Sequence, residues 1–185
     1  MAGRHDRIDL RAASMTQWRI RSAAPEDTEG VVDLLNYAAD QLRERGISQW
    51  HPGWMNSERM LPMIQRGETF VVHDAVGNLI ATVSLNDRPD QDFWTPDEQK
   101  VPALYLSKLA GRVSGVGGWL LDWAVQRAYS LGYEAVRLDA WATNEGLHKY
   151  YRERGWAHLR TMRIPGRNSG ALFEFRTKAP SRSAQ

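Results

Sequence analysis

The sequence predicts a single α/β domain with a central, mixed and twisted β-sheet of about seven strands, flanked by about four helices. Three observations predict it. The chain has 185 residues, which is enough for one well-buried domain and short for two. Hydrophobic residues make up 42% of it and charged residues 25%, as in ordinary globular proteins. Segments with strand-like and helix-like spacing alternate along the second half of the chain, an order typical of α/β folds.

The first third of the chain predicts one strand and two helices. Residues 18–22 alternate as a strand, and Pro25 followed by acidic residues indicates a helix N-terminus. Apolar residues then recur at helical spacing until Gly46. An irregular aromatic stretch comes next, and a second, shorter helix is expected near residues 56–67.

The middle of the chain predicts a hairpin, a loop and another strand. Residues 69–85 contain two β-rich runs around Val76-Gly77-Asn78, a turn of residues that tolerate positive φ. Residues 86–100 carry two prolines and a net acidic charge, which favours a loop. Residues 101–110 return to a strand pattern.

The last third predicts two helices and three strands. A helix over residues 117–132 is followed by a strand over residues 135–140, which has too little polar alternation for a sheet edge. A short helix is expected over residues 144–155. Residues 156–164 and 171–177 close the chain as two more strands.

Charge and composition exclude several classes of protein. The formal net charge is only +2, and much of the basic excess lies near the chain ends, so no nucleic-acid partner is expected. The chain has no cysteine, which excludes disulfides, thiolate metal sites and a cysteine nucleophile. No apolar stretch is as long as a membrane span, and the N-terminus lacks the apolar core of a signal peptide. We therefore expect a cytoplasmic protein with no membrane partner.

The stretch GRVSGVGGWLL places glycines between a strand and a helix, where phosphate groups commonly bind. A nucleotide-binding P-loop needs a lysine and a hydroxyl residue after its last glycine, but Trp119 and Leu120 follow Gly118. A dinucleotide fingerprint needs a third glycine where Leu120 stands. Both loops are excluded, and a plain flexible turn stays open as the alternative to a phosphate site.

Two blocks resemble the GNAT superfamily of N-acetyltransferases. The pattern Arg112-x-x-Gly115-x-Gly117 is similar to the pyrophosphate loop of that family, Gln/Arg-x-x-Gly-x-Gly/Ala. A side chain at either glycine would obstruct the approach of a pyrophosphate to backbone N–H groups. The second block, Asn144-x6-Tyr151-x3-Gly-Trp, resembles the family segment that lies further along the chain.

The resemblance covers roughly residues 15–177, with 1–14 as a flexible N-terminal extension and 178–185 as a C-terminal tail. It implies a single GNAT-like domain with acetyl-CoA as cosubstrate. The residues implied for cofactor binding are Leu109, Ala110, Arg112, Val113, Ser114, Gly115, Val116, Gly117, Gly118, Asn144 and Tyr151. The strand before the loop looks shorter than the family's and lacks its usual Val-x-Pro-x-x-Arg, so pantetheine contacts are placed near Leu109 and Ala110.

The resemblance also implies a reaction, the direct transfer of an acetyl group from acetyl-CoA to a primary amine in a ternary complex. A backbone N–H near Leu109 would polarise the thioester carbonyl, and Tyr151 would protonate the departing thiolate. Structural alternatives stay open. Asn144 would serve equally as a helix N-cap, Tyr151 would fit as a core aromatic, and Tyr150 is a rival for either role.

No motif determines the general base. The candidates are His51, Asp139 and Glu98. Of these, His51 titrates in the right range. His148 is expected on the exposed face of its helix. His73 and His158 lie in strands without a carboxylate or histidine at ligand spacing, so no metal is expected.

The expected acceptor-binding residues are Trp50, His51, Trp54, Trp94 and Asp139. The first three surround a Pro-Gly turn, and Trp94 lies in the carboxylate-rich segment 87–98. Carboxylates and aromatic rings suit a cationic amine, which favours a small-molecule amine such as a polyamine or an aminoglycoside. A protein lysine or N-terminus stays open as acceptor. So does the interpretation that the tryptophans only pack the loops and the acids are merely solvated.

Two other functions stay open. The main alternative is a degenerate domain that binds acyl-CoA without turnover, as a sensor or partner module. A toxin that acetylates aminoacyl-tRNA would need a basic face, which the near-neutral net charge disfavours. Many members of the family dimerise, so a homodimer is compatible with the resemblance, although no residue indicates one.

Overall fold

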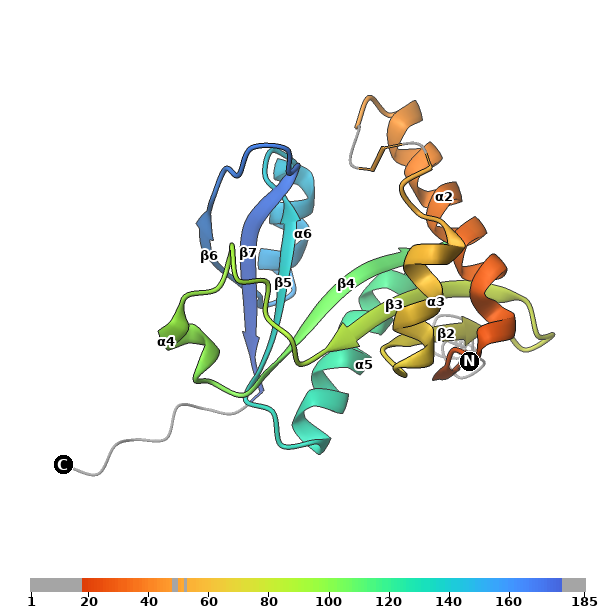
Figure 1. The fold of residues 1–185 in the computed structure, drawn as a ribbon, viewed down its shortest axis with the longest axis horizontal. Helices are drawn as coiled ribbons and strands as arrows, with labels where there is room; N and C mark the ends of the chain where they lie inside the picture. The colour runs from red at the N-terminus through yellow and green to blue at the C-terminus, as the bar shows by residue number, and fades with distance from the viewer. Residues whose placement is uncertain (1–17, 48–49, 52, 178–185) are drawn as a thin grey trace, which may run out of the picture.

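The structure, a computed structural model, describes residues 18–47, 50–51 and 53–177. The expected extension 1–14 and tail 178–185 lie outside the described residues. Seven strands form one sheet in the order β1-β2-β3-β4-β5-β7-β6 (Figure 1). Their bounds are β1 Arg19–Ser22, β2 Thr69–His73, β3 Leu79–Asn86, β4 Ala103–Gly111, β5 Ala135–Trp141, β6 Ala157–Thr161 and β7 Ser169–Arg176.

The sheet is mixed, as predicted. Strands β4 and β5 pair in parallel, while the other neighbouring pairs of the described sheet are antiparallel. Strand β5 lies between β4 and β7, which confirms that residues 135–140 are not a sheet edge. None of the helices in the described ranges has the length and apolar character that crossing a membrane requires.

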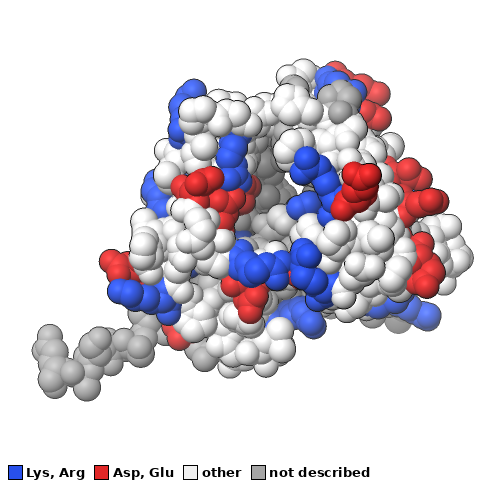
Figure 2. Space-filling model, viewed as in Figure 1, with Lys and Arg blue, Asp and Glu red and all other residues white. Residues whose placement is uncertain are grey.

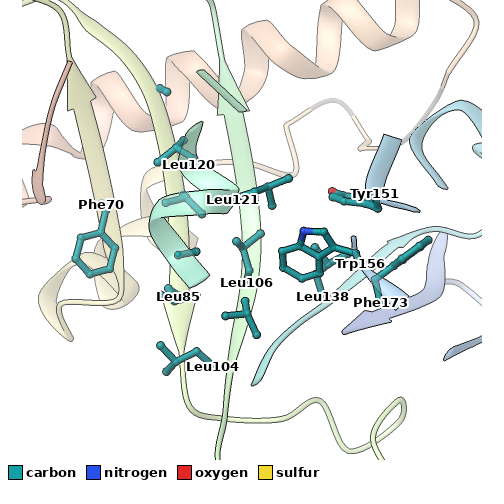
Figure 3. Close-up of a cluster of buried hydrophobic side chains, with 14 of the residues drawn as sticks. Phe70, Leu85, Leu104, Leu106, Leu120, Leu121, Leu138, Tyr151, Trp156 and Phe173 are labelled. Carbon is teal, nitrogen blue, oxygen red and sulfur yellow. The ribbon is translucent and has the colours of Figure 1, made fainter. Parts of the chain in front are cut away.

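Helices cover both faces of this sheet. Their bounds are η1 Pro25–Asp27, a single 3₁₀ turn, then α2 Thr28–Glu44, α3 Ser57–Gln65, α4 Pro96–Gln99, α5 Val116–Ser130 and α6 Glu145–Glu153. One face carries α5 and α6, whose apolar side chains pack with the sheet into the larger core (Figure 3). The other face carries α2 and α3, which bury a second cluster around Val31, Leu35 and Met60.

The helix predictions are confirmed apart from the segment 86–100, which was expected to be a loop and contains the short helix α4. Its N-cap Thr95 accepts a hydrogen bond from the Glu98 N–H, and the Glu98 carboxylate accepts one from the Thr95 N–H. Pro96 occupies the first helical position, where its missing N–H costs nothing. A single turn has too few residues to produce a helical period, so the sequence pattern did not reveal it.

Strands β4 and β5 separate partway along their length, and this separation positions the site. Their register runs from Ala103–Ala135 to Leu106–Leu138 and stops there. Both strands continue, β4 to Gly111 and β5 to Trp141, so the sheet opens like a V between them (Figure 1). The backbone groups along this opening are free of a sheet partner on that side.

Candidate active site

The glycine turn forms the N-terminus of α5. Gly115 is the N-cap, has φ of 86° and offers no side-chain hydrogen bond to the helix. The first N–H groups of an α-helix have no intrahelical acceptor, and the helix dipole adds partial positive charge there. The end of α5 thus presents unmatched donors next to the β4–β5 opening, an arrangement that suits an anion.

Glycine occupies positions 111, 115, 117 and 118 of this turn, and a side chain would have a different consequence at each. Gly115 needs its left-handed φ, and a Cβ at Gly111 would collide with the buried side chain of Val116. A Cβ at Gly118 would displace the guanidinium of Arg154 from α6. At Gly117 a Cβ would meet only ordinary contacts, 3.5 Å from the Leu109 side chain and 3.9 Å from the Tyr150 hydroxyl. The chain's own packing therefore does not require glycine at position 117.

The other predicted cofactor residues surround this turn. Val113 and Ser114 are exposed, whereas Val116 is buried in the core, so only its backbone faces outward. The Arg112 N–H donates to the Ile80 carbonyl at 2.9 Å, and its guanidinium lies 5.1 Å from the centre of the Tyr37 ring on α2. Strand β4 therefore runs directly into the glycine turn.

Along the opening, the last residues of β4 face opposite ways. Leu109 packs against the core beneath α5, while Ala110 is buried on the α2 side. Asn144 is the N-cap of α6, and its side-chain oxygen accepts a hydrogen bond from the Leu147 N–H at 3.0 Å. The structural role that the sequence left open for Asn144 is therefore present.

Tyr151 and Tyr150 lie on α6 but in different surroundings. Tyr151 is 8% exposed, and its ring centre lies 5.1 Å from that of Phe173 and 6.0 Å from that of Trp156. Its hydroxyl points toward Leu121 of α5 (Figure 3). Burial raises the pKa of Tyr151 above its ordinary value, so the phenol keeps its proton at neutral pH. Tyr150 is 36% exposed, with its hydroxyl beside Gly117.

A pocket of about 690 Å³ lies on the opposite face of the sheet, where α2 and α3 pack. Its lining includes all of the predicted acceptor residues, namely Trp50, His51, Trp54, Trp94 and Asp139. Figure 2 shows the hollow between the two halves of the molecule, with basic and acidic side chains along its rim. Ser107 and Leu106 of β4 reach the same pocket, so it borders the strand opening.

Of the candidate bases, Asp139 has the best environment. Its carboxylate is partly buried in the pocket wall on β5 and accepts a hydrogen bond from the Ser169 side chain. Burial raises its pKa above the ordinary value of 3.8, which makes the carboxylate a stronger proton acceptor. His51 also lines the pocket but is exposed at its rim.

Glu98 does not suit the role of base that the sequence left open for it. Both of its carboxylate oxygens accept hydrogen bonds from Arg160, at 2.5 and 2.8 Å, and Thr95 donates to it as well. The Arg160 guanidinium lowers the pKa of Glu98 to about 2, against an ordinary 4.5. A carboxylate held so firmly in its charged form is a poor proton acceptor, so Glu98 anchors α4 to β6.

The prediction for His148 was wrong. Its side chain is 2% exposed, and its Nε2–H donates to the Trp141 carbonyl at 2.7 Å. It stacks on His158, with ring centres 5.8 Å apart. His148 and Tyr151 are three residues apart on α6, so both lie on the buried face of the helix. No group of three or more His, Asp or Glu side chains in the described ranges is placed to bind a metal.

Several carboxylates of the segment 87–98 are engaged within the protein. Asp90 accepts a hydrogen bond from Arg167 at 2.6 Å, and Asp97 pairs with Lys100 at 2.6 Å on the exposed surface. Trp94 is 2% exposed and packs against Tyr105, with ring centres 5.6 Å apart. The acidic character that the sequence assigned to this loop is therefore largely neutralised where it meets the pocket.

Sequence reasoning missed many of the residues that line the pocket, and four of them bear on its chemistry. They are Tyr105, Lys108, Arg137 and Arg167. Arg137 had a signal, because a charged residue within the apolar strand 135–140 requires a buried partner. The partner is Glu174, which accepts a hydrogen bond from its Nε at 2.8 Å. Lys108 had none, since its position depends on a bulge in β4.

A mixed sheet that opens between two parallel strands, with a glycine turn at one side and a polar pocket on the other face, defines a fold of the acyltransferase class. The chain belongs to the acetyltransferase (GNAT) family, whose model matches residues 33–156. It is 32% identical over 149 residues to YesJ, an uncharacterized N-acetyltransferase of Bacillus subtilis (strain 168); the match covers 74% of this chain and 80% of that protein. The expected family membership and transferase class are thereby confirmed.

Solved structures of the family share the fold. An acetyltransferase of the GNAT family from Listeria monocytogenes 4b F2365 superposes with a TM-score of 0.72 at 21% identity, covering 86% of this chain and 94% of that one. The structure of yncA from Salmonella typhimurium, a putative acetyltransferase solved with its cofactor acetyl-CoA, gives a TM-score of 0.63 at 14% identity, covering 88% and 95%. The α/β fold predicted from the sequence is confirmed.

Proposed function

We propose that the protein transfers an acetyl group from acetyl-CoA directly to the primary amine of a small molecule in a ternary complex. The observation that carries this proposal is the V-shaped opening between β4 and β5. It joins the glycine turn at the head of α5 to the pocket on the opposite face. Two substrates entering from opposite faces would meet at the opening, where a direct attack needs them.

The cofactor side fits the phosphates of coenzyme A. The N–H groups of the turn from Val113 to Gly118 would take the pyrophosphate, with Gly117 giving it room and Arg112 beside it. The backbone of Leu109 and Ala110 and the side chain of Asn144 would border the pantetheine. When bound, the cosubstrate supplies the activated acetyl thioester.

The proton chemistry is assigned to one side chain on each face of the sheet. The carboxylate of Asp139 would take one proton from the incoming ammonium, which frees the nitrogen lone pair for the carbonyl carbon. The Leu109 N–H would donate to the carbonyl oxygen as it gains negative charge. As the new N–C bond forms and the C–S bond breaks, the Tyr151 hydroxyl would protonate the departing thiolate. The nitrogen would then lose its second proton to restore the Tyr151 phenol, so that the products are the amide, the free thiol and the proton held by Asp139.

Thiol release from acetyl-CoA across a panel of primary amines tests the proposal, with acetyl-CoA binding measured by calorimetry on the same sample. We expect amine-dependent thiol release and a matching acetylated product by mass spectrometry. Tight acetyl-CoA binding with no thiol release for any amine would instead favour the degenerate sensor or partner module. The cytoplasmic location and the homodimer stay predictions.

A further inference from the structure

The charged lining of the pocket differs from the acidic site that its sequence segment indicated. The charged side chains in the wall are Arg88, Lys108, Arg137, Arg167, Asp90 and Asp139. Four cations thus face two carboxylates, before any ion pairs are considered.

Most of these charges are already matched by partners within the protein. The ion pairs are Arg88 with Glu68 at 2.5 Å, Arg137 with Glu174 at 2.8 Å, and Arg167 with Asp90 at 2.6 Å. In the described part of the chain, the side chains of Lys108 and Asp139 have no ion-pair partner within 4.0 Å. Burial lowers the pKa of Lys108, and the nearby Asp139 carboxylate acts against that lowering without forming an ion pair with it. Each of these two groups can therefore still take a partner from a molecule that enters the pocket.

Lys108 reaches the pocket because β4 carries a bulge. Thr82 of β3 is opposite Ala110, but Ser84 is opposite Ser107, so β4 has one extra residue between these pairs. A bulge breaks the regular alternation of side chains between the two faces of a strand. The charges that act on Lys108 are those of Asp139 in the pocket wall, Arg59 of α3 and Glu68, which places its side chain on the pocket face of the sheet. The bulge thus turns the lysine away from the core under α5.

The backbone conformation of Lys108 carries strain. Its φ is 51°, and it is the one non-glycine residue with a positive φ in the described ranges. A left-handed backbone is unfavourable for lysine because its Cβ approaches the following carbonyl oxygen. Lys108 is partly buried and lines the pocket. Strain of this kind persists where the surrounding structure holds it in place, and it gathers at binding sites.

Lys108 and Asp139 lie just past the point where the two strands part. The last paired residues are Leu106 and Leu138, so both charged residues follow that pair by one or two positions on adjacent strands. Resting on the acetyl transfer proposed above, we propose that the acceptor is an amino acid or similar amino carboxylate. Its carboxylate binds Lys108, and its amine faces Asp139.

The remaining walls of the pocket are aromatic and apolar, which favours an amino carboxylate with an apolar side chain. Trp50, Trp54 and Tyr105 line the pocket together with Met55 and Met63. Its volume of about 690 Å³ is larger than the charged ends of an amino carboxylate need. An aromatic or long aliphatic side chain fills the rest and buries apolar surface.

Matched pairs of amines test the proposal, each pair differing only in the carboxylate. Suitable pairs are tryptophan with tryptamine, phenylalanine with phenethylamine, and 4-aminobutyrate with propylamine, with spermidine as a polycation. We expect kcat/KM to be about tenfold or more higher for the acid of a pair, since a charged hydrogen bond is worth roughly 1.5–3 kcal/mol. Lys108→Gln removes this preference and Lys108→Arg retains part of it.

Two controls separate binding from damage to the fold. Lys108→Gly deletes the ammonium and relieves the positive φ, so it removes the preference in a chain that keeps its bulge. Lys100→Gln changes a lysine that pairs with Asp97 on the exposed surface of α4, and it leaves the preference intact. Equal kcat/KM within each pair for the wild type, or equal losses for both members in the Lys108 variants, would overturn the proposal.

A failure of the proposed acetyl transfer can be told apart from a failure of the proposed carboxylate site. If no amine releases thiol, the proposed activity is wrong, and calorimetry with the same pairs in the presence of coenzyme A decides the question of the acceptor. Tighter binding of the acids, lost in Lys108→Gln, supports the carboxylate site. Equal binding of acid and amine, or preferred binding of spermidine, overturns it.

Discussion

The glycine turn and the pocket sit at the same strand opening but are built in contrasting ways. The turn is one continuous stretch that offers backbone N–H groups at the head of α5. The pocket is assembled from separate stretches of the chain and offers charged and aromatic side chains. Its lining consists of residues 50–51, 54–55, 63, 86, 88–90, 94, 105–108, 137–139 and 166–169. In the proposed function, the backbone N–H groups bind the phosphates that all acyl-CoA donors share. The side chains of the pocket select the acceptor.

The contrast implies that the two regions can be changed independently. Substitutions in the turn are expected to alter the use of acetyl-CoA, and those in the pocket to alter the acceptor. Substitutions of Tyr151 and Asp139, which lie on opposite faces of the sheet, are expected to alter the chemical step itself.

The largest effect is expected for Tyr151→Phe. Loss of the hydroxyl removes the proton donor for the thiolate, so kcat should fall by about 10³-fold, within the range of general acid catalysis. Acetyl-CoA affinity by calorimetry should stay the same. Tyr150→Phe is the matched control on the same helix and should keep most of the activity. A larger loss of kcat in Tyr150→Phe than in Tyr151→Phe would assign the role of general acid to Tyr150 instead.

A loss of about 10²-fold in kcat/KM is expected for Asp139→Asn, because the amine then lacks its proton acceptor. Only the ionised carboxylate accepts a proton, so the wild-type rate should rise with pH through a pKa that burial places above 3.8. The variant should lose this rise. Burial disfavours the charge, so the variant should also unfold at higher urea than the wild type. A pH–rate profile unchanged by the substitution would point to His51 or water.

In the turn, Gly117→Ala should weaken acetyl-CoA binding about tenfold, the effect of one obstructed phosphate contact. Its Tm should stay the same or rise, because the added Cβ meets only ordinary contacts and alanine favours a helix over glycine. Gly111→Ala is the comparison, since its Cβ collides with the buried Val116 and should lower the Tm. An unchanged affinity of Gly117→Ala for acetyl-CoA would contradict the assignment of the pyrophosphate to this glycine.

The smallest effect on activity is expected for Glu98→Gln, which lies outside both regions. Folding lowers the pKa of Glu98 from 4.5 to about 2, so its stabilisation is complete above pH 4.5 and is lost as the pH falls through about 2. Urea unfolding at pH 7 should show a loss of about 2 kcal/mol, typical of a charged hydrogen-bonded pair. The gap from the wild type should narrow below pH 4.5, while kcat stays within about twofold. A large loss of kcat at full stability would restore Glu98 as a base.

The sequence predicted what depends on local spacing. The glycine turn, the Asn144 cap and the succession of strands and helices along the chain follow from patterns within a few residues, so the sequence could predict them. Aromatic residues in irregular segments also indicated the pocket wall. Contacts between residues that are far apart in the chain could not be predicted from the sequence. Glu98 was misjudged because its partner Arg160 is 62 residues away. Lys108 was missed because a bulge has no residue signature of its own.

The most direct test of the account is a crossed kinetic comparison of Gly117→Ala and Lys108→Gln with the wild type, varying acetyl-CoA and a tryptophan–tryptamine pair. The account predicts that Gly117→Ala raises the KM for acetyl-CoA and keeps the preference between the two amines. It predicts that Lys108→Gln keeps the KM for acetyl-CoA and abolishes the preference. If either variant changes both quantities together, or neither, the assignment of donor and acceptor to opposite faces of the β4–β5 opening is contradicted.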